Sequence, residues 1–244
     1  MKLVVQIPCY NEEEFLVAAI NDIPEHIAGV SGIAIVVIDD GSEDRTAEVA
    51  EAHPRVSKVV KLPCHQGLAV AFRAGIETAL NLSADIIVNT DADNQYPGAE
   101  ISGLIKPILE NKADFVIGYR DIKNIKHFSY WKKIAQKAGS RVVSSICAQQ
   151  IPDATSGFRA FNRHSALWID VIASNYTYTL ETLVRLASQK VRISHVPITI
   201  NPPVRKSRLM GSSSEYIARS ALDILTLLYI YSPLKVFICL AAFF

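Results

Sequence analysis

One stretch limits the possible folds of this chain more than any other: ADIIVNTDADNQYP, at residues 84–97. It begins with the short apolar run Ile86–Val88, which is typical of a strand buried on both faces of a sheet. Asp91 and Asp93 follow, and positions i and i+2 of an extended segment point to the same side. Carboxylates at the carboxyl end of a parallel strand lie where open α/β sheets bind ligands.

The Asp91 and Asp93 pair predicts a site for a divalent cation. Mg²⁺ and Mn²⁺ prefer oxygen ligands and also bridge to diphosphate oxygens. Gln95, two positions beyond Asp93, adds an amide oxygen to the candidate metal ligands. The alternative interpretation is an acidic, solvated turn after the strand. A D-x-D pair alone does not separate the two, so the choice depends on the rest of the chain.

Apolar runs alternate with helix-like segments, and this alternation predicts an α/β fold with a mostly parallel sheet and helices on both faces. We expect strands at residues 3–7, 33–38, 56–62, 86–88, 115–118 and 191–200. We expect helices starting at residue 11 and spanning 44–52, 67–82, 100–110, 131–148 and 180–189. The polar segment 153–159 is expected to be a loop.

Composition fits one large domain. A chain of 244 residues with 50% hydrophobic content can bury a full core. Its net charge of +1 gives no indication of nucleic-acid binding. The four cysteines form no C-x-x-C pair, so we expect reduced thiols in a cytoplasmic protein and no zinc site. No signal peptide is visible, because the first apolar run is short and acidic residues follow it.

The end of the chain is apolar. Residues 236–244 include no polar side chain, yet a spanning helix needs about 20 apolar residues. We therefore expect a catalytic domain over 1–211, then a membrane-associated segment of amphipathic and hydrophobic helices over 212–244, cut short or ending as a surface anchor. Basic residues before the apolar run favour the cytoplasmic membrane face. The alternative is a terminal helix packed on the core.

Polar clusters follow three of the expected strands: YNE at 10–12, DDGS at 39–42 and DAD at 91–93. Because the carboxyl ends of parallel strands share one edge, we expect these clusters to converge on one cleft. The third suits a metal diphosphate, and the second can accept hydrogen bonds from a ribose or base. The sequence contains neither G-x-x-x-x-G-K-[ST] nor G-x-G-x-x-G, which disfavours a P-loop ATPase and a Rossmann dehydrogenase.

Five motifs in order resemble those of glycosyltransferase family 2: PCYNE at 8–12, DDGS at 39–42, DADNQ at 91–95, GYR at 118–120 and SGFR at 156–159. More narrowly, the chain resembles the polyprenyl-phosphate sugar transferases, which include dolichol-phosphate mannose synthases. The resemblance covers most of residues 3–210. It implies the GT-A fold, a nucleotide-binding α/β sheet with a divalent metal, Mg²⁺ or Mn²⁺, and inversion of the anomeric centre.

The resemblance also implies roles for individual residues. Nucleoside binding would fall to the first two motifs, with Asp40 supporting the loop: Pro8, Tyr10, Asn11, Glu12, Asp39 and Asp40. Gly67 joins the substrate-binding set, within an HQGL segment where family members commonly have Asn and small or basic residues. The basic loop that would cover the donor phosphates contributes Arg205, Ser207 and Arg208.

The implied metal ligands are Asp91, Asp93 and Gln95, which would also hold the sugar diphosphate. Arg120 and Arg159 would meet phosphate groups, for which a guanidinium is well suited. The implied catalytic set is Asp91, Asp93, Arg120, Asp153 and Arg159.

The acceptor decides whether a general base is needed. The metal and the arginines would stabilise charge on the leaving nucleoside diphosphate while the acceptor attacks the opposite face. A polyprenyl phosphate is already ionised, whereas a sugar hydroxyl requires a carboxylate base, for which Asp153 and Glu181 are candidates. Both also have structural interpretations: Asp153 could order the loop at 156–157, and Glu181 could cap its helix.

The sequence therefore predicts a metal-dependent inverting glycosyltransferase at the cytoplasmic membrane face, peripheral or anchored through its C-terminus. It would move a hexose from a UDP- or GDP-hexose to a lipid-linked acceptor, with polyprenyl phosphate the first choice. One alternative is an enzyme that extends a polysaccharide or glycolipid on a sugar hydroxyl. Another is a non-catalytic nucleotide-binding scaffold. The base, the sugar and the oligomeric state stay open at this point.

Overall fold

The computed structural model describes residues 1–120, 130–170 and 178–202, together with Thr226 and Tyr229. Its strands are β1 (Lys2–Cys9), β2 (Gly32–Asp39), β3 (Val56–Lys61), β4 (Ile86–Asn89), β5 (Phe115–Arg120), β6 (Arg159–Asn162) and β7 (Ile193–Ile198). Its helices are α1 (Leu16–Asp22), α2 (Thr46–Ala52), α3 (Leu68–Asn81), α4 (Glu100–Leu109), α5 (Tyr130–Cys147), α6 (Arg163–Trp168) and α7 (Tyr178–Ser188).

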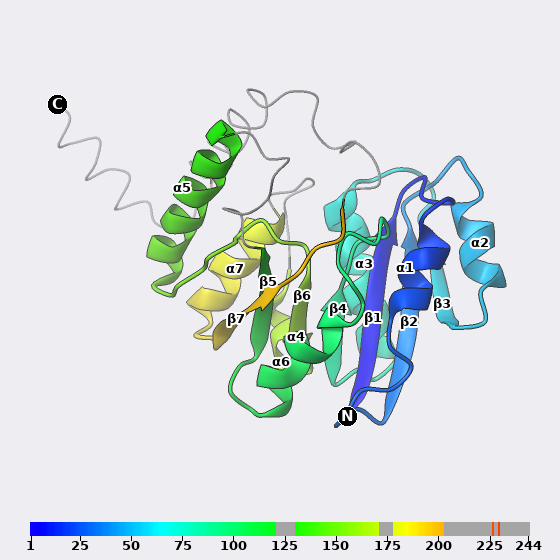
Figure 1. The fold of residues 1–244 in the computed structure, drawn as a ribbon, viewed down its shortest axis with the longest axis horizontal. Helices are drawn as coiled ribbons and strands as arrows, with labels where there is room; N and C mark the ends of the chain where they lie inside the picture. The colour runs from blue at the N-terminus through cyan, green and yellow to red at the C-terminus, as the bar shows by residue number, and fades with distance from the viewer. Residues whose placement is uncertain (121–129, 171–177, 203–225, 227–228, 230–244) are drawn as a thin grey trace.

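The strands form one sheet in the order β3-β2-β1-β4-β6-β5-β7 (Figure 1). β1 lies between β2 and β4 and is parallel to both, and β2 is parallel to β3. β5 and β7 are also parallel to each other, whereas β6 is antiparallel to both β4 and β5. The expected α/β fold with a mostly parallel sheet is therefore confirmed, with β6 reversed inside it.

Helices cover both faces of the sheet, as the alternation of strands and helices predicts. Alternate residues of β1 belong to different cores: Val4 packs with side chains of α3, α5, α6 and α7, and Leu3 packs with those of α1, α2 and α4. Both residues are fully buried. A strand with both faces buried is mostly apolar, which explains why these strands can be predicted from the sequence.

β6 and α6 are absent from the sequence prediction, which ends the loop at residue 159 and assigns nothing between 159 and 168. The strand has four residues, is too short for a clear alternation, and begins with the charged Arg159. Its antiparallel register pairs Arg159 with Asn89 at the end of β4 and with Ile117 of β5. The reversal brings residues 153–158, which precede β6, to the carboxyl edge of the sheet.

The helix expected from residue 11 begins only at Leu16. Asn11 has a φ of 53° and donates its backbone N–H to the Ser42 hydroxyl, so the backbone cannot start a helix there. The chain then turns, and Phe15 and Leu16 both donate to the Glu12 carbonyl. The acidic residues expected in the first helical turn form this turn instead.

The helices expected within residues 212–244 lie outside the described residues, apart from single positions. No helix in the described ranges combines the length and the apolar character needed to cross a bilayer. The assignment of 212–244 to a membrane-associated segment stays a prediction.

Candidate active site

The sequence-predicted site residues that the structure describes lie at or next to the carboxyl edge of the sheet. Those of the first two motifs lie at the ends of β1 and β2 or just after them, and the DAD segment follows β4. Arg120 ends β5, Arg159 begins β6, and Asp153 precedes β6. Gly67 immediately precedes α3. The basic-loop residues Arg205, Ser207 and Arg208 lie outside the described residues. The structure therefore gathers on one edge what the sequence spreads over 150 positions, from Pro8 to Asp153 and beyond.

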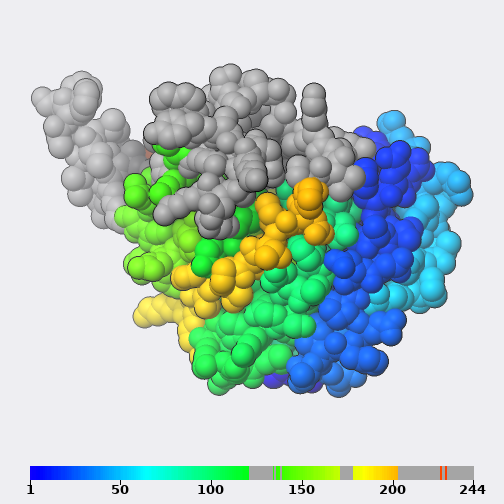
Figure 2. Space-filling view, viewed as in Figure 1, coloured from blue at the N-terminus to red at the C-terminus, as the bar shows by residue number. Residues whose placement is uncertain are grey.

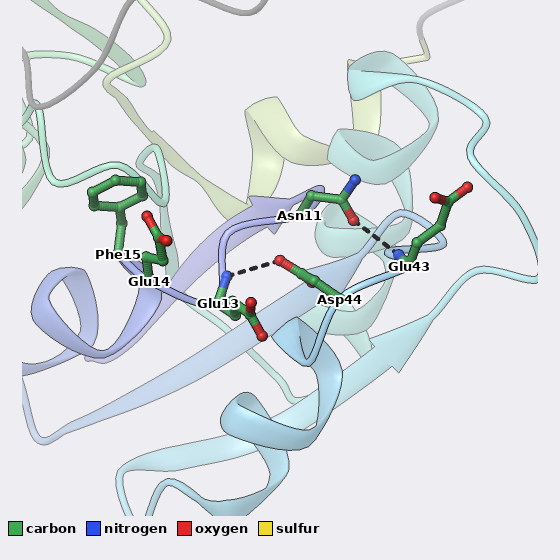
Figure 3. A pocket seen from close by; sticks show the side chains of 6 residues that line it. All are labelled: Asn11, Glu13, Glu14, Phe15, Glu43 and Asp44. Carbon is green, nitrogen blue, oxygen red and sulfur yellow. Dashed lines mark hydrogen bonds between the residues drawn. The ribbon is translucent and has the colours of Figure 1, made fainter.

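The loops after β1 and β2 are tied together by Asn11. Its side-chain oxygen accepts a hydrogen bond from the Glu43 backbone N–H at 2.8 Å, and the Glu12 N–H donates to the Thr46 hydroxyl at 2.7 Å. Beside this contact is a hollow of about 350 Å³, which Figure 3 shows from close by. Its lining is mostly acidic: Asn11, Glu13, Glu14, Phe15, Glu43 and Asp44. Because these carboxylates repel phosphate oxygens, we do not assign the nucleotide diphosphate to this hollow.

Asp40 organises the loop between β3 and α3. Its buried carboxylate accepts hydrogen bonds from the backbone N–H groups of Gln66 and Gly67, at 2.8 and 2.9 Å. It also pairs with Nδ1 of His65 at 2.8 Å. The neighbouring Asp39 is buried too and accepts from the Ser42 N–H at 3.3 Å. These contacts are those expected of a residue that supports the loop, as predicted for Asp40, and Asp39 is the last residue of β2, at the carboxyl edge of the sheet.

Gly41 lets two loops approach each other backbone to backbone. Its φ is +70°, and a Cβ on it would lie 2.4 Å from the carbonyl carbon of Cys64. No side chain fits at that distance, so glycine is required for the loop after β2 to pack on the loop after β3.

Asp91 and Asp93 come close enough for their charges to interact. Burial, and after it the negative charge of Asp93, raise the pKa of Asp91 to about 7, while Arg120 opposes the rise. Asp93 accepts a hydrogen bond from the Gln95 backbone N–H at 3.0 Å. A Cβ on Gly157 would lie only 3.2 Å from an oxygen of Asp91, so the loop before β6 packs directly on this carboxylate.

The donor set at Asp91 and Asp93 fits a divalent cation. A bound cation would stabilise the ionised form of Asp91, which burial and Asp93 disfavour. No group of three or more His, Cys, Asp or Glu side chains in the described ranges is arranged to hold a metal. The protein would therefore supply few ligands, and diphosphate and water oxygens would supply the rest, as Mg²⁺ commonly requires.

Arg120 and Asp153 form a buried, bidentate ion pair. Nε of Arg120 lies 2.7 Å from one carboxylate oxygen and Nη2 lies 3.1 Å from the other, while Nη2 also donates to the Thr155 hydroxyl at 3.0 Å. Burial opposes ionisation of Asp153, but the charge and hydrogen bonds of Arg120 hold its pKa below the usual range. A carboxylate in this state is a poor proton acceptor, so the geometry argues against the general-base role considered for Asp153.

Arg159 does not present its guanidinium to the cleft. The side chain is fully buried, and it donates to the carbonyls of Ser156, Thr179 and Ala154 at 2.7, 2.8 and 2.8 Å. Burial lowers its pKa to about 10, so it is still protonated at neutral pH. The expected phosphate contact is corrected here: the guanidinium fastens the 154–156 loop to the start of α7, because the side chain is fully buried and three of its five N–H donors bind backbone carbonyls.

Two residues of the site region were missed by the sequence reasoning. Asn89 accepts from the Gln6 side chain at 2.9 Å and donates to the Gly157 carbonyl at 2.8 Å, which connects the sheet interior to the loop against Asp91. A polar side chain inside each of two apolar strands was the available signal. His65 is the second, and its contacts exist only because the loop after β3 packs on the loop after β2, which no local sequence pattern indicates.

The chain after β7 returns to the DAD loop. Asn201 donates its backbone N–H to the Gln95 carbonyl at 2.9 Å and its side-chain amide to the Asn94 carbonyl at 2.8 Å. Thr199 donates to the Glu100 carboxylate, at the start of α4. Figure 2 shows the segment around residue 200, in orange, on the surface beside the green segment around residue 100. Asn201 is thus fixed to the DAD loop, and the basic loop predicted to cover the donor phosphates begins four positions later, at Arg205.

The family model described as "Glycosyl transferase family 2" matches residues 4–167. A UDP-N-acetylglucosamine--dolichyl-phosphate N-acetylglucosaminyltransferase of Methanococcus voltae is 30% identical over 213 residues, which cover 79% of this chain and 82% of that protein. A dolichol-phosphate mannosyltransferase of Pyrococcus furiosus is 32% identical over 221 residues, covering 87% of this chain and 60% of that protein.

A solved structure of glucosyl-3-phosphoglycerate synthase from Mycobacterium tuberculosis, in complex with Mn²⁺, UDP and phosphoglyceric acid, has a similar fold. The TM-score is 0.71 at 19% identity, over 95% of this chain and 78% of that chain, and at this identity the likeness shows the fold alone. The fold and the family match define the chain as a transferase built on the GT-A fold. It belongs to glycosyltransferase family 2.

Proposed function

We propose that this protein transfers a hexose from a nucleotide sugar to polyprenyl phosphate, with inversion, a divalent metal, and a location at the cytoplasmic face of the membrane. The observation that carries the proposal is the carboxyl-edge arrangement of the Asp91–Asp93 pair beside the Arg120–Asp153 ion pair. Support for the lipid acceptor comes from relatives named for dolichyl or dolichol phosphate. Support for the metal and UDP comes from the ligands of the M. tuberculosis synthase.

The donor diphosphate would bind at the DAD loop. Asp91, Asp93 and the Gln95 amide would hold the metal, which when bound supplies positive charge to the leaving nucleoside diphosphate. Asn89 and Gly157 keep the loop before β6 against Asp91. The nucleoside would lie over the loops after β1 and β2, next to Asp39 at the end of β2.

Arg120 would act on a phosphate group from a fixed position. Asp153 and the Thr155 hydroxyl hold its Nε and Nη2, so the guanidinium plane is set before substrate arrives. Arg159 donates to the Ala154 and Ser156 carbonyls and so fixes the backbone of the loop that carries Asp153 and Thr155. In this proposal Arg120 touches substrate, and Asp153 and Arg159 are positioning residues.

The candidate bases favour a phosphate acceptor over a sugar hydroxyl. Asp153 is held ionised by Arg120, with its pKa below the usual range. Glu181, the other candidate, is buried on α7. An acceptor phosphate is ionised already and needs neither residue to remove a proton. A sugar-hydroxyl acceptor would need a base, and Asp153 in its pair with Arg120 is a poor one.

The membrane location is supported by the sequence beyond the described ranges, where an apolar run follows basic residues. We expect the full chain to sediment with vesicles of phosphatidylglycerol and less with vesicles of phosphatidylcholine. Sedimentation with neither kind of vesicle would contradict the location without bearing on the chemistry.

The test is transfer of radiolabelled sugar from UDP-N-acetylglucosamine, UDP-glucose or GDP-mannose to undecaprenyl phosphate in detergent. We expect label in the organic phase with Mn²⁺ or Mg²⁺ and loss of it with a chelator. Nucleotide binding without donor consumption would favour the scaffold alternative. Label transferred to an oligosaccharide but not to the lipid phosphate would favour the sugar-hydroxyl alternative.

A further inference from the structure

Two rings from separate loops stack at the carboxyl edge of the sheet. Tyr10, after β1, and His65, after β3, have ring centroids 3.9 Å apart and an interplanar angle of 22°. Their sequence positions are 55 residues apart, so the contact exists only through the fold. The family resemblance includes Tyr10 among the nucleoside-binding residues, whereas the function proposed above gives His65 no role.

The His65 ring is anchored from two directions. Its Nδ1 lies 2.8 Å from the buried carboxylate of Asp40, which also accepts the backbone N–H groups of Gln66 and Gly67. The backbone at Cys64 and His65 packs directly on Gly41, where a Cβ would come within 2.4 Å of Cys64 and 2.6 Å of the His65 nitrogen. Moving His65 away would remove one hydrogen-bonding partner of a buried charge, which is unfavourable.

The His65 side chain is nonetheless 52% exposed, in contrast to Asp40 at 4%. It therefore combines a fixed position with a ring surface open to solvent. Aromatic faces held in this way are the usual platforms for nucleic-acid bases, because every base has a π-face that stacks on them. Tyr10 supports the ring from behind and Asp40 holds its edge.

We propose that His65 is a nucleotide-binding residue that stacks on the nucleobase of the donor, with Tyr10 as the ring behind it. This inference rests on the proposed function, since it needs a nucleotide at this edge of the sheet. Affinity for the base would thus depend on a ring that the motif residues do not include.

Calorimetric titration of UDP and GDP into the full chain, with Mn²⁺, tests the proposal. We expect His65→Ala to weaken binding of the preferred nucleotide roughly tenfold, and His65→Phe to keep it within about threefold of wild type, because a phenyl ring preserves stacking. His164→Ala is the matched control: His164 is also exposed and contacts an aromatic ring, Trp168, but lies on α6 away from the carboxyl edge. We expect no change for this variant.

The outcomes separate the two proposals. If wild type binds neither nucleotide, the proposed function fails. If wild type binds one and His65→Ala binds it equally well or more tightly, only the role of His65 fails; tighter binding would mean that the ring covers the surface that the base needs. Loss of binding in His65→Phe as large as in His65→Ala would also overturn stacking, because it would assign the effect to the hydrogen bond with Asp40.

Discussion

Replacing Asp91 with Asn should stabilise the metal-free protein, and the gain should grow with pH. Burial and the charge of Asp93 raise the pKa of Asp91 to about 7 in the folded state, whereas an Asp in an unfolded chain has a pKa of about 3.9. Between these values the folded state binds more protons than the unfolded state. Stability of the wild type therefore falls as pH rises through this window and levels off above it.

The size of the effect follows from the shift. About three pKa units at ~1.36 kcal/mol each give an upper limit of ~4 kcal/mol for the cost of ionising Asp91 on folding. Because Asp91 is partly exposed, solvent screening reduces this to about 1–3 kcal/mol. The neutral amide of the Asp91→Asn variant escapes the cost. The variant should gain this much over wild type at pH ~8 and clearly less at pH ~5.

Urea denaturation in chelator, at several pH values between about 4 and 8, measures the difference. Glu51→Gln is the control, since Glu51 is an exposed partner of Lys61 on the surface, and we expect its effect to stay within about 0.5 kcal/mol at every pH. Added Mn²⁺ should stabilise wild type and not Asp91→Asn. A difference between Asp91→Asn and wild type that is constant with pH, or that shrinks as pH rises, would refute the reasoning.

Three further changes test the site. Asp93→Asn should lower sugar transfer by about 100-fold or more with the melting temperature nearly unchanged. Normal turnover in this variant would refute the assignment of Asp93 as a metal ligand. Arg159→Met should cost about 3–5 kcal/mol in urea denaturation, because it removes a buried cation from three carbonyls, and a loss below about 1 kcal/mol would contradict the positioning role. Gly157→Ala should weaken Mn²⁺ binding several-fold, measured by calorimetry, since its Cβ would lie 3.2 Å from Asp91. Unchanged binding would show that the loop before β6 moves without disturbing Asp91, and would contradict this prediction.

Much of the fold could be predicted because its strands are buried on both faces. The runs around Val5, Val36 and Val88 have no solvent-facing side, so their apolar character is uninterrupted enough to mark them. β6 could not be predicted, because four residues beginning with a charged Arg159 carry no pattern of their own. Its pairing with β4 and β5 is decided by tertiary contacts.

The site divides in the same way. Motif positions gave the edge at which Asp91, Asp93 and Arg120 meet, since strand ends determine that edge. The motifs did not predict which hydrogen-bond or ion-pair partner each site side chain has. Whether Arg159 faces a phosphate or a set of carbonyls depends on where α7 begins relative to β6, and the Thr179 carbonyl is 20 residues from the arginine that it binds. Side-chain direction at this range is a property of packing, which a single sequence does not display.

The reversed strand β6 accounts for the form of the site. In a parallel strand, the residues before it would enter from the amino edge of the sheet, opposite the DAD loop. Because β6 is antiparallel to β4, its first residue is paired with Asn89, the last of β4. The preceding loop then delivers Asp153 to Arg120 and Gly157 to Asp91. The sheet gains from this reversal both the buried ion pair and the backbone that packs against the Asp91 carboxylate.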